Sequence, residues 1–235
     1  MKIILGFLLV ACSTTGCAQI GSSQVDQSQI YTGYSASYNE TGAKLELSAT
    51  FSVGNGIGTS VNLDSPSEVT ADSQTLDKTT DLVNQIIYQS VASGVSSTTW
   101  QNQHVFVYTD NNGTSYSNTL TIPSAVSVTN SSGSSYSKAA GVTVHWTAAH
   151  SVQSSETLVA YISGSTTGQA TGMTSSTGTV GSIQISAADL AQMPTGSAHL
   201  FICRGNGGSV SQAPKVGGSY RVSYCSASVP VTLNP

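Results

Sequence analysis

The four cysteines are the residues whose type and spacing can do chemistry most directly. Cys12 and Cys17 follow an N-terminal apolar run, whereas Cys203 and Cys225 lie near the C-terminus. The first two thiols lie beside an apolar run and the other two on predicted strands, where two thiols of an exported protein can form a disulfide. The two pairs of cysteines therefore predict two different kinds of chemistry.

The first residues have the layout of a secretory signal. Met1 and Lys2 supply a short positive start, and an uncharged apolar run extends from Ile3 to Ala11. This run is too short to span a bilayer, which needs about 20 residues, but it has the length of a signal-peptide core. Residues 1–17 are therefore interpreted as a signal peptide and take no part in the predicted fold.

The cysteines that follow resemble the signal of bacterial lipoproteins, in which a peptidase cuts before a cysteine that becomes diacylated with fatty acids such as palmitate. Leu9–Cys12 fits the lipobox better by residue type but leaves a very short signal. Cys17 has the better position and follows the small residue Gly16. The resemblance implies lipidation at Cys17, with Cys12 as the alternative. It also implies outer-membrane sorting, because Ala18 follows Cys17 where an aspartate would favour inner-membrane retention.

A soluble secreted protein is the alternative to a lipid-anchored one. Gly16-Cys17-Ala18 resembles a small-x-small cleavage site with a cut after Ala18. Residues 18–40 are rich in Ser, Gln, Gly and Tyr without a clear period, which predicts a flexible tether between membrane and fold. Three tyrosines of this segment can face a partner or pack along an edge strand: Tyr31, Tyr34 and Tyr38.

Cys203 and Cys225 form a candidate disulfide. Both lie on predicted strands, and closing a loop of this length stabilises a fold by roughly 3 kcal/mol. A hairpin centred on Gly207–Gly218 would, however, place Cys203 nearer Tyr220 than Cys225. Two separate buried thiols therefore remain the alternative.

No pattern in the sequence predicts a catalytic residue, a metal site or a cofactor. The histidines lack the spacing of a metal site and are interpreted as surface or edge residues, with His104 and His145 at polar phases of their strands. They are His104, His145, His150 and His199. Ser135 and Lys138 have the Ser-x-x-Lys spacing of penicillin-recognising enzymes but lie in a Gly/Ser-rich loop rather than a helix. The segment Asp110–Gly113 lacks the later bidentate Glu of a calcium loop and is predicted as a turn.

Composition narrows the class of protein further. Only 8% of the 235 residues are charged and the formal net charge is -4, whereas a typical domain is roughly 25% charged. Nucleic-acid binders need clustered Lys and Arg, and charge-driven disorder needs a high net charge. The chain is therefore predicted to be a folded protein that binds no nucleic acid.

Strand patterns fill most of the chain. Apolar residues at alternate positions from Leu45 to Val53 predict a half-buried strand, and the Asn-Gly in Asp110–Gly113 predicts a hairpin. A single short helix is predicted over Ala187–Met193, capped by Ser186 with Asp189 three residues later. The remaining predicted strands are Thr59–Leu63, Glu68–Ala71, Asn84–Val91, Thr99–Tyr108, Ser115–Ile122, Thr157–Ser163, Thr179–Ile185, Ala198–Arg204, Ser219–Cys225 and Val229–Leu233.

The second half resembles fibronectin type III and related immunoglobulin-like domains. Gly141–Thr147 is similar to the strand of that family whose alternating run ends on a buried Trp, here Trp146. Ile183–Arg204 resembles the later strands and the corner between them. The resemblance implies a β-sandwich and supplies no activity of its own.

We therefore expect an all-β chain with two tandem immunoglobulin-like β-sandwiches. The expected divisions are a signal peptide with lipobox (1–17), a tether (18–40), a first sandwich (41–123) and a second, fibronectin type III-like sandwich (124–235). The expected function is a non-catalytic binding or structural module of the bacterial cell envelope, on the outer membrane or facing the periplasm. Its expected partners are the membrane, through the lipid anchor, and an envelope protein or glycan. A secreted adhesin or surface-appendage subunit is the first alternative, and a hydrolase or carbohydrate-active enzyme is the second.

Overall fold

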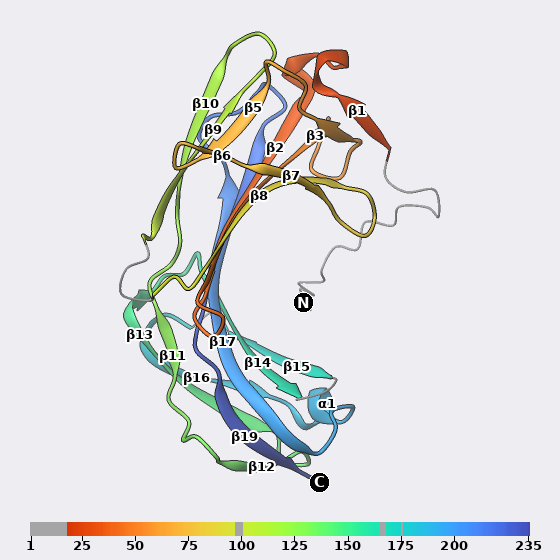
Figure 1. Cartoon of the computed structure of the whole chain (residues 1–235). Coiled ribbons are helices and arrows are strands. Elements are labelled where there is room, and N and C mark those ends of the chain that lie inside the picture. Colours follow the sequence, from red (N-terminus) through yellow and green to blue (C-terminus); the bar gives the residue numbers. More distant parts are fainter. Residues whose placement is uncertain (1–17, 97–100, 165–167, 175) are drawn as a thin grey trace.

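The chain folds almost entirely into β-strands, which confirms the all-β class (Figure 1). The computed structural model describes residues 18–96, 101–164, 168–174 and 176–235. The helical pieces in these ranges are each a single turn: η1 (Ser22–Gln24), η2 (Gln27–Gln29) and α1 (Ala187–Leu190).

One 12-stranded sheet runs through the whole molecule. Its main path follows, in spatial order, β1 (Gln19–Gly21), β4 (Ser60–Asn62), β3 (Lys44–Val53), β2 (Ile30–Asn39), β18 (Gly218–Cys225), β17 (Gly196–Ser209), β14 (Thr157–Gly164) and β15 (Gln169–Thr174). The other members lie beside this path: β7 (Asp77–Thr80), β8 (Ile86–Ser93), β12 (Ser135–Ser137) and β19 (Val229–Asn234).

Two smaller sheets cover one face of this long sheet, one at each end (Figure 1). In the upper lobe of Figure 1 the covering strands are β10 (Ser115–Thr121), β9 (Gln103–Thr109), β5 (Glu68–Ala71) and β6 (Gln74–Thr75). In the lower lobe they are β11 (Val126–Val128), β13 (Val142–Val152) and β16 (Gly178–Ile185).

Aromatic side chains fill the upper core, and Trp146 is the largest buried side chain of the lower core. Tyr34 and Phe51 of the long sheet meet Phe106 and Tyr108 of the covering sheet, with ring centroids 5.1 and 4.7 Å apart. Such tilted ring pairs add to the stabilisation that burying apolar area provides. The two layers are therefore held together by side chains that project from both sheets.

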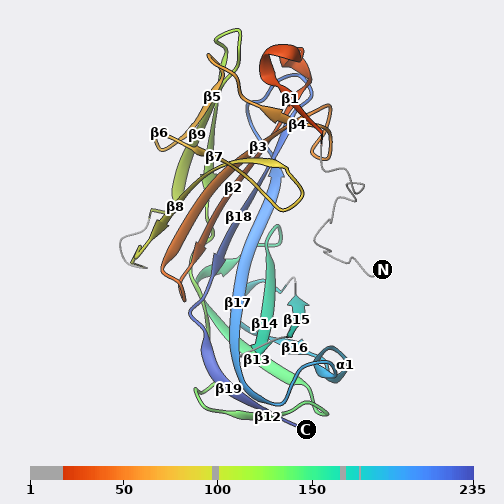
Figure 2. The ribbon, with the colours of Figure 1, turned by 45° about the vertical axis from the view of Figure 1, so that its right-hand side comes forward.

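Strand β17 belongs to both lobes. Its first residues pair with β19, its last residues pair with β18, and β18 in turn lies parallel to β2 (Figure 2). The chain does not divide at residues 123 and 124 into two independent sandwiches, because residues 205–225 complete the upper lobe. The two tandem sandwiches of the prediction are thus two lobes built on one continuous sheet.

The predicted tether is wrong for residues 30–39, which form a central strand of the long sheet. Ile30, Tyr34 and Tyr38 are buried on the core side, together with Thr32, which is fully buried. Glycine and serine occupy most of the opposite positions, so side-chain size alternates more clearly than polarity. A pattern of this kind is weak by the hydrophobic periodicity that identifies most strands.

Several local predictions are confirmed. Asp110 directly follows β9, and its Oδ1 accepts hydrogen bonds from the N–H groups of Asn112 and Thr114, both at 2.9 Å. Gly113 then takes the positive φ of 79° that the turn requires. Helix α1 begins where predicted, with the Ser186 hydroxyl accepting from the Asp189 N–H, but ends at Leu190. The polar stretch from Thr75 to Leu82, for which no strand was predicted, contains β7.

A buried ion pair joins the strands at the waist between the lobes. Arg204 on β17 and Glu156, the residue before β14, have side chains that are 3% and 7% exposed. The guanidinium donates from Nε and Nη2 to the two carboxylate oxygens, at 3.1 and 2.7 Å. Its remaining donors reach oxygens of Ser124, His150 and Ser151. One fully bonded cation therefore ties together the segment between the lobes, the end of β13 and both central strands.

We expect this pair to show strong energetic coupling. Arg204→Met leaves an uncompensated buried carboxylate and should lower the free energy of unfolding by about 3–5 kcal/mol. Arg204→Met combined with Glu156→Gln should cost clearly less than the sum of the single changes, measured by urea unfolding.

The exposed pair Lys44–Glu46, with Nζ and Oε2 at 3.0 Å, is the matched control. A cycle of Lys44→Met and Glu46→Gln should give a coupling of about 0–1 kcal/mol. Equal coupling energies at the two pairs would contradict the role given to Arg204.

Candidate functional site

The structure places the two pairs of cysteines differently. Cys12 and Cys17 lie outside the described residues. Cys203 and Cys225 form a disulfide, with Cα atoms 4.1 Å apart. The strand register predicted for this hairpin is wrong, because β17 continues to Ser209 and so brings Cys203 directly opposite Cys225.

His104 is buried rather than on the surface, which corrects its interpretation. Its Nδ1 lies 2.7 Å from Oδ2 of Asp72, and the side chain shares the inner side of β9 with Phe106 and Tyr108. Val105 points outward instead and is 40% exposed, so the expected phase of the strand is reversed. The Nε2 atom of His104 has no hydrogen-bond partner among the described residues. Burial keeps this atom from acting as a base on a dissolved substrate. The other three histidines are exposed.

The remaining residues with catalytic spacing have structural contacts. Lys138 donates from Nζ to the carbonyl oxygens of Ala191 and Met193, directly after helix α1. Within the described residues, no three side chains of the His, Cys, Asp and Glu types lie close enough to hold a metal ion.

The face of the long sheet opposite the core is concave, and no sheet formed by the described residues covers it (Figure 1). Strand registers define this face, because directly paired residues point to the same side. On β2 and β18 it carries small polar residues such as Ser35, Ser37 and Ser223, and β3 adds Ser48 and Thr50. Such a surface offers hydroxyl groups and accessible backbone and carries little charge.

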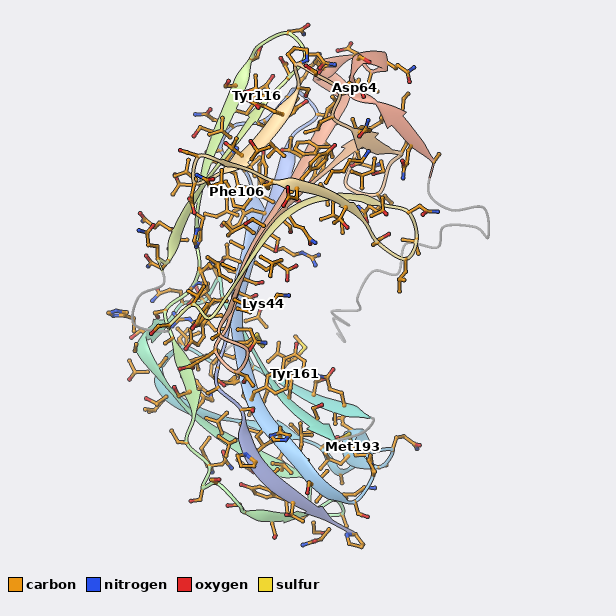
Figure 3. The ribbon with its side chains drawn as sticks, in the orientation of Figure 1. Lys44, Asp64, Phe106, Tyr116, Tyr161 and Met193 are labelled. Atoms are coloured by element: carbon orange, nitrogen blue, oxygen red, sulfur yellow. A yellow bond between two sulfur atoms is a disulfide. The ribbon has the colours of Figure 1, made fainter. Side chains whose placement is uncertain are left out.

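An apolar cluster interrupts these small residues in the lower half of the concave face. We name it the concave patch; it consists of Val159, Tyr161, Met173, Phe201 and the Cys203–Cys225 disulfide. The strand registers run Cys225, Cys203, Val159, Met173 in one row, with Phe201 beside Tyr161 in the next. The rings of Tyr161 and Phe201 stack, with centroids 4.8 Å apart and planes inclined by 9°. Figure 3 shows Tyr161 on the side of the sheet that faces the hollow.

The surroundings of the concave patch are polar and almost uncharged. Lys44 and Glu46 form an ion pair on β3, and Arg221 on β18 lies further along the same face. Burial raises the pKa of the Tyr161 hydroxyl, so this group stays protonated at neutral pH and can donate a hydrogen bond. The patch can stack against a flat or apolar group and bond a hydroxyl, but it offers no acid–base pair.

One feature of the sequence could have indicated this patch, although the alternation of polar and apolar residues did not. Leu158–Ile162 is an uninterrupted apolar run, Leu-Val-Ala-Tyr-Ile, and both faces of β14 are therefore apolar. Runs of this kind are typical of strands covered on both faces. In β14 the core side is buried, whereas the described part of the chain leaves Val159 and Tyr161 on the other side partly exposed, which distinguishes the patch from an ordinary surface.

Comparison with known proteins assigns no family: no family model matches the chain, and no curated protein matches it. None of the helices in the described ranges has the length and apolar character needed to cross a bilayer.

We predict that the disulfide stabilises the fold at this patch. Replacing both cysteines, as Cys203→Ala with Cys225→Ala, should lower the free energy of unfolding by about 3 kcal/mol because the unfolded chain regains the freedom of a 22-residue loop. Urea unfolding of the double variant checks this, and the wild type in reductant should reach a similar stability. Wild-type stability in the double variant would contradict the prediction.

Proposed function

We propose that this protein is an exported, lipid-anchored module of the bacterial cell envelope, and that it binds its partner non-catalytically through the concave patch. The uncovered sheet face with its stacked Tyr161–Phe201 pair is the observation that carries the binding role. The signal-like N-terminus and the cysteine at position 17 support the anchor. The Cys203–Cys225 disulfide is compatible with an oxidising compartment.

The chemistry of the patch favours a weakly charged partner. Aromatic rings combine large contact area with few rotatable bonds, and buried tyrosines at interfaces keep a hydroxyl for bonding. Ser, Thr and Gly around the rings suit a glycan or a neutral protein surface better than a polyanion. An envelope glycan or an uncharged face of an envelope protein is thus the proposed partner.

The anchor predicts a defined mass for the mature protein. Mass spectrometry of the intact protein from a bacterial envelope fraction should show a chain that begins at Cys17 and carries diacylglycerol. The modification should disappear in Cys17→Ser and persist in Cys12→Ser. An unmodified chain that begins at Gln19 would refute the anchor and favour a secreted form.

The binding role predicts contacts at one face of the sheet. A photo-crosslinking benzophenone residue at position 161 or 173 should yield crosslinked envelope material in the producing cells. Val180 on β16 is 69% exposed and lies outside the concave patch, so the same residue at position 180 is the matched control. Equal products at positions 161 and 180, or none at 161 and 173, would contradict the role of the concave patch.

A further inference from the structure

We infer that two loops of the upper lobe form a second membrane contact, in which exposed apolar side chains enter the lipid surface around the point where the chain leaves the fold. These are the exit loops: residues 54–59 between β3 and β4, and residues 81–85 between β7 and β8. They carry three large apolar side chains that the fold leaves exposed: Ile57, Leu82 and Val83. This inference rests on the proposed anchor for its orientation but makes its own prediction.

Leu82 is held outward by an ordered turn. Oδ1 of Asp81 accepts from the N–H groups of Val83 and Gln85, at 2.9 and 2.8 Å, and the Asn84 N–H donates to the Asp81 carbonyl at 3.1 Å. Leu82 thereby reaches an exposure of 105%, the highest among the large apolar residues described. An exposed leucine on a bonded turn loses little conformational freedom when it is buried, so binding it costs less than binding a flexible segment.

The second exit loop is built in a similar way. The Ile57 N–H donates to Oδ1 of Asn55 at 3.0 Å, and the Gly58 N–H donates to the Asn55 carbonyl at 3.1 Å. Ile57 is 60% exposed on this turn. Both loops therefore present an aliphatic side chain from a backbone that hydrogen bonds hold in place.

Hydrogen bonds connect both exit loops, directly or through a neighbouring residue, to Ala18 and Gln19, the first residues that the structure describes. Nε2 of Gln19 donates to the Asn84 carbonyl at 2.7 Å, which joins β1 to the loop after β7. Ser60, next to the other loop, donates from its N–H to the Ala18 carbonyl at 3.1 Å. Figures 1 and 2 show the β7–β8 loop on the side of the molecule where β1 begins.

The length of chain before β1 sets how far the loops are from lipid. A residue spans at most about 3.5 Å, and Ala18 is already bonded to the fold, so an acylated Cys17 would hold the bilayer against this end of the sheet. Acylation at Cys12 would add five residues of reach and a correspondingly looser contact. The contact is apolar rather than electrostatic, because nine acidic residues and two lysines lie between Asp26 and Asp110.

Tryptophan quenching by lipid tests this inference directly. The variants Leu82→Trp, Ile57→Trp and Val180→Trp of the acylated protein are placed on vesicles of brominated phosphatidylcholine, with the wild type subtracted for its own tryptophans. Position 180 is the matched control because its exposure of 69% lies between those of Ile57 (60%) and Leu82 (105%) while it belongs to the lower lobe. Fluorescence should fall for positions 82 and 57 relative to unbrominated vesicles, and position 180 should not change. Circular dichroism checks that each variant is folded.

The outcomes separate this inference from the proposed anchor. Acylated protein that floats with vesicles but shows no quenching at positions 82 and 57 would overturn the membrane contact while the anchor stands. If the protein is not acylated, the same variants are mixed with the vesicles as unmodified chains. Quenching would then support the contact without the anchor, and its absence would overturn it. Quenching at all three positions would show an unspecific association and would also overturn it.

Discussion

The buried pair of Arg204 and Glu156 is the interaction on which the two-lobed arrangement depends. A guanidinium removed from water is stable only when its charge is neutralised and its donors are bonded. Here the carboxylate supplies the charge, and Ser124, His150 and Ser151 supply the other acceptors. Because these acceptors come from three segments of the chain, satisfying one side chain fixes the relative position of β14, β17 and the segment between the lobes.

The shared strand β17 turns this local constraint into a rigid surface. It pairs with β19 in one lobe and with β18 in the other. Between these two pairings, Ser226 bonds to Ile202: its Oγ accepts from the Ile202 N–H, and its own N–H donates to the Ile202 carbonyl. The Cys203–Cys225 disulfide lies beside this change of pairing, on the concave face of the sheet and thus on the side opposite the buried Arg204. The concave patch is thus built where covalent and hydrogen-bonded links are concentrated, so its shape is preorganised for binding.

Polarity patterns predicted most of the long strands and missed β2, in which side-chain size rather than polarity alternates. β3 and β13 alternate apolar and polar residues; β3 was predicted to within one residue, whereas β13 continues five residues beyond the predicted end at Thr147. β2 hides its period, since Thr32 is buried while Gly33 and Ser35 face outward. Arg204 could not be recognised as a buried residue from the local sequence, because a single arginine in a strand is usually exposed. Its partners, from Ser124 to Glu156, are distant in the sequence. Sheet order across the lobes depends on such distant contacts and therefore could not be read from local sequence.

The correction at β2 changes what an N-terminal anchor would mean. A flexible tether of 23 residues would let the fold turn freely above a membrane, and no face would be privileged. With β1 and β2 inside the long sheet, an anchor at Cys17 would act on the edge of a rigid body. The exit loops would then face lipid, and the concave patch would be held at a fixed position in the lower half of the same sheet. A weakly charged binding face on a rigid, membrane-fixed sheet needs no mobile arm to present it, because the sheet itself sets its height and direction.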